Sequence, residues 1–195
     1  MPNDEYSELV DIEHVDPAIL IALFYKTDQN FTGQPIYPPE AKAYLLKPVA
    51  KALSEANKQF MDDGYKIKVW DAYRPFHLQE TLWRAYPDER YVKKPLERNG
   101  IKEKGSLHSK GAAVDMTLVS TRTNTELSMP TFFDDFTEKA HRNYMALPQQ
   151  IIENRQYMEY VMNRHGFHGL PTEWWHFNWQ DSAELEFLDQ PITPN

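Results

Sequence analysis

The sequence predicts an α+β fold in a single domain, 1–195, built from a small, mainly antiparallel sheet with helices packed against it. Apolar residues recur at helical spacing over 40–62 and 148–164, whereas 65–74 and 111–119 have the patterns of strands. No internal repeat, low-complexity tract or long linker divides the 195 residues, a length that can bury a full hydrophobic core.

The first predicted helix covers 40–62 and ends at Gly64, a residue typical of helix ends. Pro48 lies within it, and proline either kinks a helix or marks its first turn. The apolar positions that define this helix are Ala41, Leu45, Val49, Leu53, Ala56 and Phe60.

A strand over 65–74 follows, because YKIKVWDAYR alternates apolar and polar residues. Pro75 suits the first turn of a helix over about 75–86. The charged segment 88–105 predicts an excursion over the surface.

In the second strand, 111–119, Asp115 points away from the apolar face formed by Val114, Met116 and Leu118. Helices are predicted near 134–145 and over 148–164. A last strand over about 174–179 carries the aromatic segment WWHFNW.

Charge and hydropathy exclude several kinds of partner. The net charge of −8 argues against nucleic acid and against anionic membranes, both of which select basic surfaces. No run of about 18 apolar residues is present to span a bilayer. The segment MPNDEYSELVDIEHVD lacks the features of a secretory signal, which predicts a cytoplasmic location, or a periplasmic one only if a signal was removed from a longer precursor.

The chain contains no cysteine, which excludes disulfides, a thiol nucleophile and thiolate metal sites. Any metal must therefore be bound by imidazole and carboxylate groups. Such donors are typical of catalytic zinc, whereas structural zinc usually recruits cysteine.

Three short segments carry candidate chemistry. In SLHSKGAAVD, His108 and Asp115 would offer zinc a nitrogen and an oxygen, although two such residues seven apart are more often surface or hydrogen-bonding groups. In WDAYRP, Arg74 ends a strand and could stabilise an oxyanion, or form a structural salt bridge.

The third segment, EWWHF, places Glu173 three residues before His176, as a proton acceptor near a zinc-binding histidine. In a flat strand these two side chains would face opposite sides. Glu173 is therefore expected in a loop, with the strand starting near Trp174.

Together these segments resemble the D-alanyl-D-alanine dipeptidases of the vancomycin-resistance type, within the larger family of zinc D-Ala-D-Ala peptidases. The motifs are W-D-A-Y-R-P, S-x-H-x-x-G-x-A-x-D and E-W-W-H, in that order. Two further segments are similar to the dipeptidases in particular: Y-x-x-x-x-N-F-T-G, from Tyr25 to Gly33, and M-x-x-x-F-D, from Met129 to Asp134.

The resemblance implies one Zn²⁺ per chain, bound by His108, Asp115 and His176, and a small dipeptide substrate, D-Ala-D-Ala. It implies Glu173 as general base and acid, with Arg74 as stabiliser of the tetrahedral intermediate. The remaining implied residues bind substrate: Tyr25 and Asp134 at its free ammonium, and Ser106.

Two alternatives stay open. A zinc D,D-carboxypeptidase or peptidoglycan endopeptidase would keep this chemistry and accept longer stem peptides, and a non-catalytic binding module would keep only the scaffold. The sequence does not choose between a role in vancomycin resistance and one in D-alanine recycling, nor does it indicate an oligomeric state.

Overall fold

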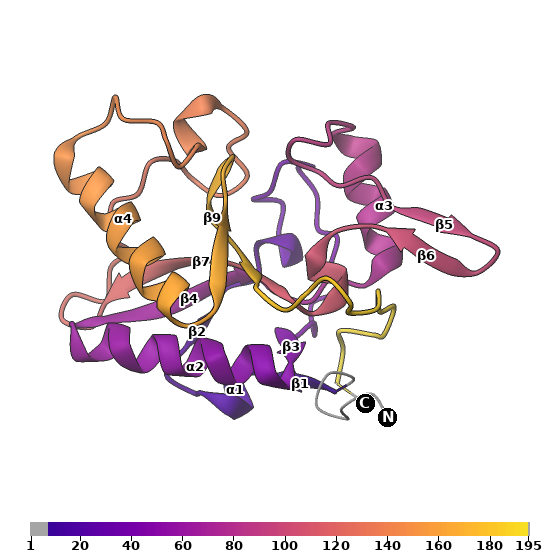
Figure 1. The fold of residues 1–195 in the computed structure, drawn as a ribbon, viewed down its shortest axis with the longest axis horizontal. Coiled ribbons are helices and arrows are strands. Elements are labelled where there is room, and N and C mark those ends of the chain that lie inside the picture. The colour runs from indigo at the N-terminus through magenta and orange to yellow at the C-terminus, as the bar shows by residue number, and fades with distance from the viewer. Residues whose placement is uncertain (1–7, 195) are drawn as a thin grey trace.

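The computed structural model describes residues 8–194, and its centre is a five-stranded sheet with the order β2–β4–β7–β9–β8 (Figure 1). Among these strands β2 runs parallel to β4, and every other neighbouring pair is antiparallel. The prediction of a mainly antiparallel sheet is confirmed. The strands are β2 (Leu20–Ile21), β4 (Tyr65–Asp71), β7 (Ala113–Ser120), β8 (Phe167–Leu170) and β9 (Glu173–Trp179).

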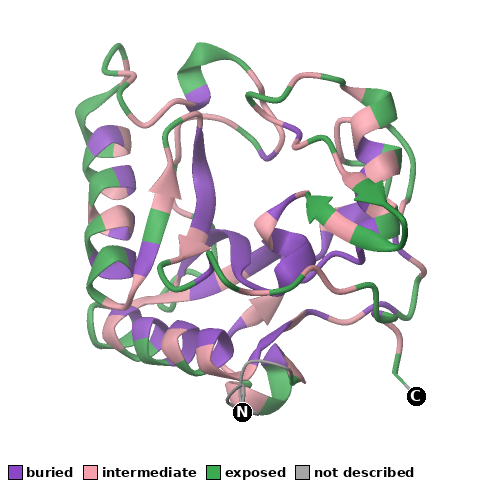
Figure 2. Ribbon diagram, turned by 45° about the vertical axis from the view of Figure 1, so that its right-hand side comes forward, coloured by how far each residue is buried: buried purple, intermediate pink, exposed green. Residues whose placement is uncertain are grey.

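Helices pack against this sheet, which confirms the α+β class. Helix α2 (Lys47–Asp62) packs on β4, α4 (Gln149–Arg164) packs on β8, and the two helices contact each other. Their sheet-facing sides are buried and their outer sides exposed (Figure 2). Helix α3 (Phe76–Ala85) lies on the far side of β9 from α4, beside an exposed hairpin of β5 (Leu96–Arg98) and β6 (Ile101–Lys104) (Figure 1).

Helix α2 begins at Lys47, so the predicted start at residue 40 is wrong. Pro48 occupies the first turn, where its missing N–H costs no intrahelical hydrogen bond, and it marks the true start. The residues before it form β3 (Tyr44–Leu46), which pairs with β1 (Leu9–Asp11), the strand that leads into the short helix α1 (Ile12–Val15).

The helix predicted over 134–145 is absent, and that segment holds only the 3₁₀ turn η4 (Glu138–Ala140). Asp134 has a φ of 60°, a left-handed conformation that cannot continue into a right-handed helix. Phe133 and Ala140 are nevertheless buried, from an irregular loop and not from a helix.

The remaining predicted elements are present, with shifted ends. Strand β4 ends at Asp71, three residues before Arg74, because the chain turns there and the Arg74 N–H donates to the His108 carbonyl at 3.2 Å. The predicted surface excursion over 88–105 carries the β5–β6 hairpin. Strands β1, β2, β3, β5, β6 and β8 and helix α1 were not predicted from the sequence.

A buried aromatic cluster holds the strands in place. Trp70 of β4 and Trp174 of β9 meet edge to face with ring centroids 5.6 Å apart, and Trp175 packs on Trp174. All three indoles are 2 % exposed or less. Since aromatic pairs of this geometry add to the energy of burial, the cluster fixes β4 and β9 relative to each other.

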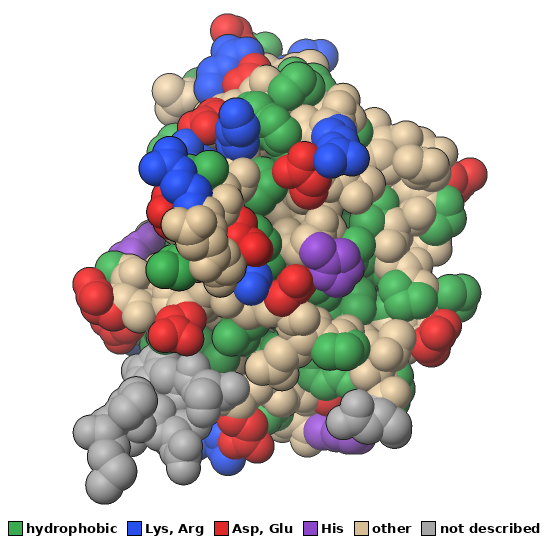
Figure 3. Space-filling view, turned by 90° about the vertical axis from the view of Figure 1, so that its right-hand side faces the viewer, with side chains coloured by type: hydrophobic (Ala, Val, Ile, Leu, Met, Phe, Trp, Pro, Cys, Tyr) green, Lys and Arg blue, Asp and Glu red, His purple; other side chains and the backbone are tan. Residues whose placement is uncertain are grey.

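Within residues 8–194, no helix is both long enough and apolar enough to cross a bilayer. The segment used to exclude a secretory signal begins at Met1, and its first seven residues lie outside the described residues. The face shown in Figure 3 mixes acidic and basic side chains, unlike the basic surfaces that select nucleic acid.

Asn57 joins α2 to the sheet and offers a test of the packing. Its buried amide accepts from the Ile67 N–H at 2.9 Å and donates to Asp16 at 3.0 Å. Because Asn57→Ala leaves these groups unpaired, we expect a loss of about 1–3 kcal/mol in the free energy of unfolding, measured by urea denaturation. The exposed Asn163→Ala should change it by less than about 0.5 kcal/mol; equal losses would contradict this account.

Candidate active site

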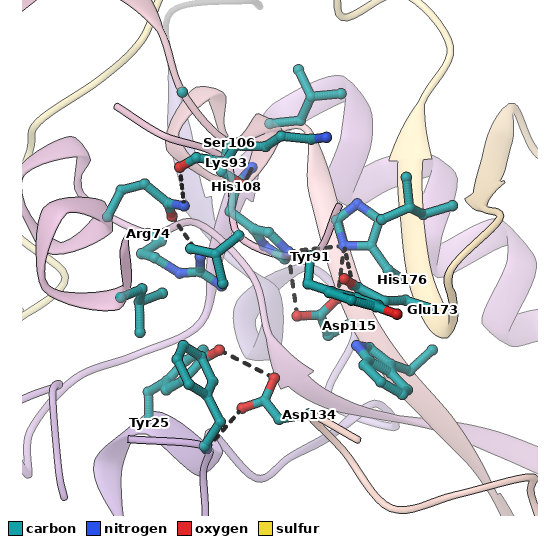
Figure 4. Close-up of a pocket in the computed structure, with 18 of the residues that line it drawn as sticks. Tyr25, Arg74, Tyr91, Lys93, Ser106, His108, Asp115, Asp134, Glu173 and His176 are labelled. Carbon is teal, nitrogen blue, oxygen red and sulfur yellow. Dashed lines mark hydrogen bonds and ion pairs between the residues drawn. The ribbon is translucent and has the colours of Figure 1, made fainter. Parts of the chain in front are cut away.

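All residues nominated from the sequence line one cavity of about 140 Å³ (Figure 4). The cavity lies at the ends of β7 and β9, between the 3₁₀ turns η2 (Phe24–Lys26) and η3 (Leu107–Lys110). It is smaller than the roughly 300–1,000 Å³ of ordinary ligand pockets, so it suits a small molecule. The nominated residues are Tyr25, Arg74, Ser106, His108, Asp115, Asp134, Glu173 and His176.

The three predicted metal ligands converge on one point. Asp115 of β7 and His176 of β9 are directly opposite in the sheet, and His108 reaches them from η3. His176 Nδ1 lies 2.9 Å from Asp115 Oδ1, and His108 Nε2 lies 3.3 Å from Asp115 Oδ2 and 3.2 Å from His176 Nδ1. Their donor atoms all lie within 4.8 Å of one another.

Hydrogen bonds behind the imidazoles decide which nitrogens face this point. His108 Nδ1 lies 2.6 Å from the Ala72 carbonyl, which can only accept, so Nδ1 carries the proton and Nε2 is free to bind a cation. His176 Nε2 lies 2.7 Å from Asn178 Oδ1, which leaves Nδ1 free in the same way. Such outer partners orient histidine ligands in metal sites.

This donor set fits zinc. Two neutral imidazole nitrogens and one carboxylate, with the cavity on their open side, match the three-ligand pattern of catalytic zinc sites. Although burial raises it, the neighbouring His108 and His176 hold the pKa of Asp115 well below its usual range, so the carboxylate is ionised. Zinc is therefore the cofactor that the donor chemistry indicates.

Glu173 is the first residue of β9, so its predicted place in a loop is wrong. The pairing of β8 with β9 shifts between Gly169 and Leu170, and this irregularity lets Glu173 and His176 line the same cavity despite their odd spacing. Glu173 Oε2 lies 3.9 Å from His176 Nδ1. Burial raises the pKa of Glu173 to about 8, which His176 partly opposes, and a dication nearby would lower it again.

Arg74 is held rigidly at the cavity wall. Its Nε donates to Asp71 Oδ2 at 3.2 Å and its Nη1 donates to Gln79 Oε1 at 2.7 Å. Its Nη2 also donates to Asp71, and its Cζ lies 5.0 Å from the ring centroid of Tyr25. Because only three of the five guanidinium N–H groups are used in this way, two are left for a ligand.

Tyr25 and Asp134 form an acidic corner of the cavity, beside Arg74, whose guanidinium lies over the Tyr25 ring (Figure 4). Asp134 accepts from the Tyr25 hydroxyl at 3.3 Å and from the Phe31 N–H at 3.4 Å, and it forms no ion pair with any described residue. Burial, and then the nearby Asp115 carboxylate, raise the pKa of Asp134 well above its usual range. A ligand cation would stabilise its charged form, so this corner favours a positively charged group.

Ser106 caps η3, since its Oγ accepts from the His108 N–H at 3.3 Å. The serine therefore helps to place a metal donor in addition to lining the cavity. None of the other described histidines joins the cluster of metal donors: His165 lies beside Gln59, His141 beside Tyr91, and His77 beside Asp189.

Comparison with known proteins shows which family the chain belongs to. A family model described as D-Ala-D-Ala dipeptidase, of the M15 peptidases, matches residues 5–194. The chain belongs to this family. D-alanyl-D-alanine dipeptidase of Escherichia coli K12 is 34% identical over 182 residues, covering 93% of this chain and 90% of the relative.

A second member, D-alanyl-D-alanine dipeptidase of Enterococcus faecalis, is 32% identical over 165 residues, covering 78% of this dipeptidase-family chain and 82% of the relative. Among solved structures, VanYB in complex with D-Alanine-D-Alanine aligns with a TM-score of 0.42 and 15% identity, covering 72% of this chain and 74% of that one. That structural likeness adds nothing to the assignment.

Several polar residues of this family member contact the site but were not nominated from the sequence, among them Asp71, Gln79, Tyr91, Lys93 and Asn178. Asp71 lies within the WDAYRP motif and could have been singled out as the partner of Arg74. Asn178, two positions after His176 on β9, shares its side of the strand. Nothing in the sequence signals Gln79, whose role depends on how α3 packs.

The metal site predicts a specific dependence on one histidine. The chain should bind one Zn²⁺, and His176→Ala should lose it because one of three protein donors is removed. Metal content after gel filtration measures this, and added zinc should raise the Tm of the wild type by mass action. His168→Ala, an exposed histidine on β8, is the control and should keep its zinc; equal loss in both variants would contradict the assignment.

Proposed function

We propose that this protein is a zinc-dependent dipeptidase that hydrolyses D-alanyl-D-alanine to two D-alanines. One observation carries this proposal: a cavity of about 140 Å³ is lined by three candidate metal donors, His108, Asp115 and His176, by the Glu173 carboxyl group and by Asp134. Membership in the dipeptidase family supports the choice of substrate. The family model spans nearly the whole chain, which supports one domain over 1–195.

Zinc bound by His108, Asp115 and His176 would supply Lewis-acid chemistry, polarising the scissile carbonyl and lowering the pKa of coordinated water. Glu173 is the proton carrier of the proposed mechanism. Its Oε1 has no hydrogen-bond partner among the described residues, so it is free to accept a proton from the attacking water. Glu173 then delivers that proton to the leaving amine.

Arg74 stabilises the negative charge that develops on the carbonyl oxygen. Asp71 and Gln79 fix the plane of its guanidinium before substrate arrives, and such preorganisation makes electrostatic stabilisation effective. Its two remaining N–H groups are the donors for that oxygen.

Asp134 and Tyr25 bind the ammonium of the dipeptide. A free ammonium would neutralise the acidic corner, whereas an acylated amine would leave the carboxylate unpaired and would need space beyond the cavity. This corner therefore favours a free dipeptide over a longer stem peptide. With such a substrate, we propose a cytoplasmic location.

The first test is D-alanine release from free D-Ala-D-Ala and from an N-acylated peptide ending in D-Ala-D-Ala, with and without added zinc. We expect zinc-dependent release from the free dipeptide and little from the acylated peptide. Release mainly from the acylated peptide would instead make the protein a D,D-carboxypeptidase and would refute the assigned role of Asp134.

Replacement of Glu173 separates proton transfer from metal binding. Glu173→Gln should keep its zinc, because it removes no metal donor, while kcat falls by about 10²–10⁴-fold. Metal content and kcat are measured on the same preparation. Glu153→Gln, at an exposed position of α4, should match the wild type in both. A glutamine variant that turns over normally would exclude Glu173 as the base.

Replacement of Asp134 tests recognition of the ammonium. Asp134→Asn should cost about 2–5 kcal/mol of transition-state binding, at least about 30-fold in kcat/KM for the dipeptide. The preference for free over acylated peptide should narrow by the same factor. The neighbouring Asp135→Asn is the control, since Asp135 accepts from the Thr137 N–H and does not line the cavity. An unchanged preference in Asp134→Asn would exclude the role.

A further inference from the structure

The pairing between β8 and β9 is interrupted beside the active site. Leu170 pairs with Glu173, while the preceding Gly169 pairs with Phe177, so residues 174–176 of β9 have no opposite residue on β8. On its other edge, β9 stays in register with β7 through His176 and Asp115. The interruption therefore brings Glu173 to the cavity without disturbing the strand pairing that holds the metal donors.

The guanidinium of Arg142 fills this interruption. Its Nε donates to the Leu170 carbonyl at 2.9 Å, and its Nη2 donates to the carbonyls of Trp174 at 3.0 Å and His176 at 2.8 Å. The side chain is only 8 % exposed, and its Cζ lies 4.4 Å from the ring centroid of Phe177. One side chain thus takes the place of the missing ladder hydrogen bonds and joins the two strands.

Gly169 leaves the space through which Arg142 enters. A Cβ atom at this position would lie 2.1 Å from Arg142 Cζ and 2.2 Å from its Nε. Real Cβ contacts do not reach such distances, so any larger residue would displace the guanidinium from its three carbonyls. The glycine is required here by the close approach of a side chain, and its φ is not in the left-handed region.

We propose that Arg142, admitted by Gly169, is a positioning residue that sets the Glu173 carboxylate and the His176 imidazole relative to each other. Arg142 binds the carbonyl of His176 itself and that of Trp174, the neighbour of Glu173, and so controls both ends of the EWWH segment. Its effect on turnover rests on the proposed function. Its effect on metal binding does not, because His176 is a metal donor in either case.

A double-mutant cycle tests this coupling. Arg142→Ala and Gly169→Ala should each weaken zinc binding and lower kcat by roughly 10- to 100-fold, the range found for groups that orient metal ligands. KM should change little, because Tyr25, Arg74 and Asp134 lie on other segments. In the Arg142→Ala background, Gly169→Ala should cause almost no further loss, since there is no guanidinium left to displace. The zinc dissociation constant is measured by competition with a chelator, independently of activity.

Asn57→Ala is the matched control, because it loses buried hydrogen bonds far from the cavity and should keep wild-type zinc affinity and kcat when folded. Losses that simply add in the double variant, or that Asn57→Ala reproduces, would overturn the proposal. If Arg142→Ala does not fold, Gly169→Ala and Arg142→Lys carry the test, with wild-type zinc affinity in both as the overturning result. A wild type inactive on D-Ala-D-Ala would refute the proposed function while the zinc measurement still decides the role of Arg142.

Discussion

The cross-strand pair of Asp115 and His176 is the contact on which the site depends. These two side chains meet directly across β7 and β9 with 2.9 Å between His176 Nδ1 and Asp115 Oδ1, and His108 closes the group from η3. A one-residue slip of this register would turn one of the two side chains to the other face of the sheet and separate the pair. Such a slip would cost free energy of folding, because a buried polar group must be paired or bind a metal. The aromatic cluster around Trp174 holds the strand that carries this contact.

A second buried network joins His108 to Arg74 through Asp71. Asp71 binds Arg74, accepts from the Tyr37 hydroxyl at 2.7 Å, and lies 3.6 Å from His108 Nδ1. The Asp71 carboxylate thereby orients the Arg74 guanidinium and lies beside Nδ1 of His108, the nitrogen that points away from Asp115 and His176. Asp134 lines the same cavity and accepts from the hydroxyl of Tyr25, whose ring lies under Arg74, so the cavity presents both a positive and a negative group.

Local patterns predicted those parts of the fold that depend on neighbouring residues. Pro48 allowed two outcomes for α2, a kink or the first turn, and the second is found, because the missing N–H of proline costs nothing there. The helix over 134–145 failed because Asp134 adopts a left-handed conformation in a loop packed against Phe31, and no local rule reports that contact. Short strands such as β1 and β3 were missed because pairing with a distant partner, across more than 30 residues of chain, defines them.

The sequence alone determined the chemistry available to this protein: with no cysteine, metal donors had to be imidazole and carboxylate, and its motifs named His108, Asp115, His176 and Glu173. The tertiary structure decided which nitrogen of each imidazole faces the His108–Asp115–His176 cluster, and how Glu173 reaches the cavity from within a strand. It also brought Arg142 into the interrupted ladder. The reason is physical: side-chain chemistry belongs to each residue, whereas orientation comes from carbonyls and carboxylates supplied by segments far apart in the chain.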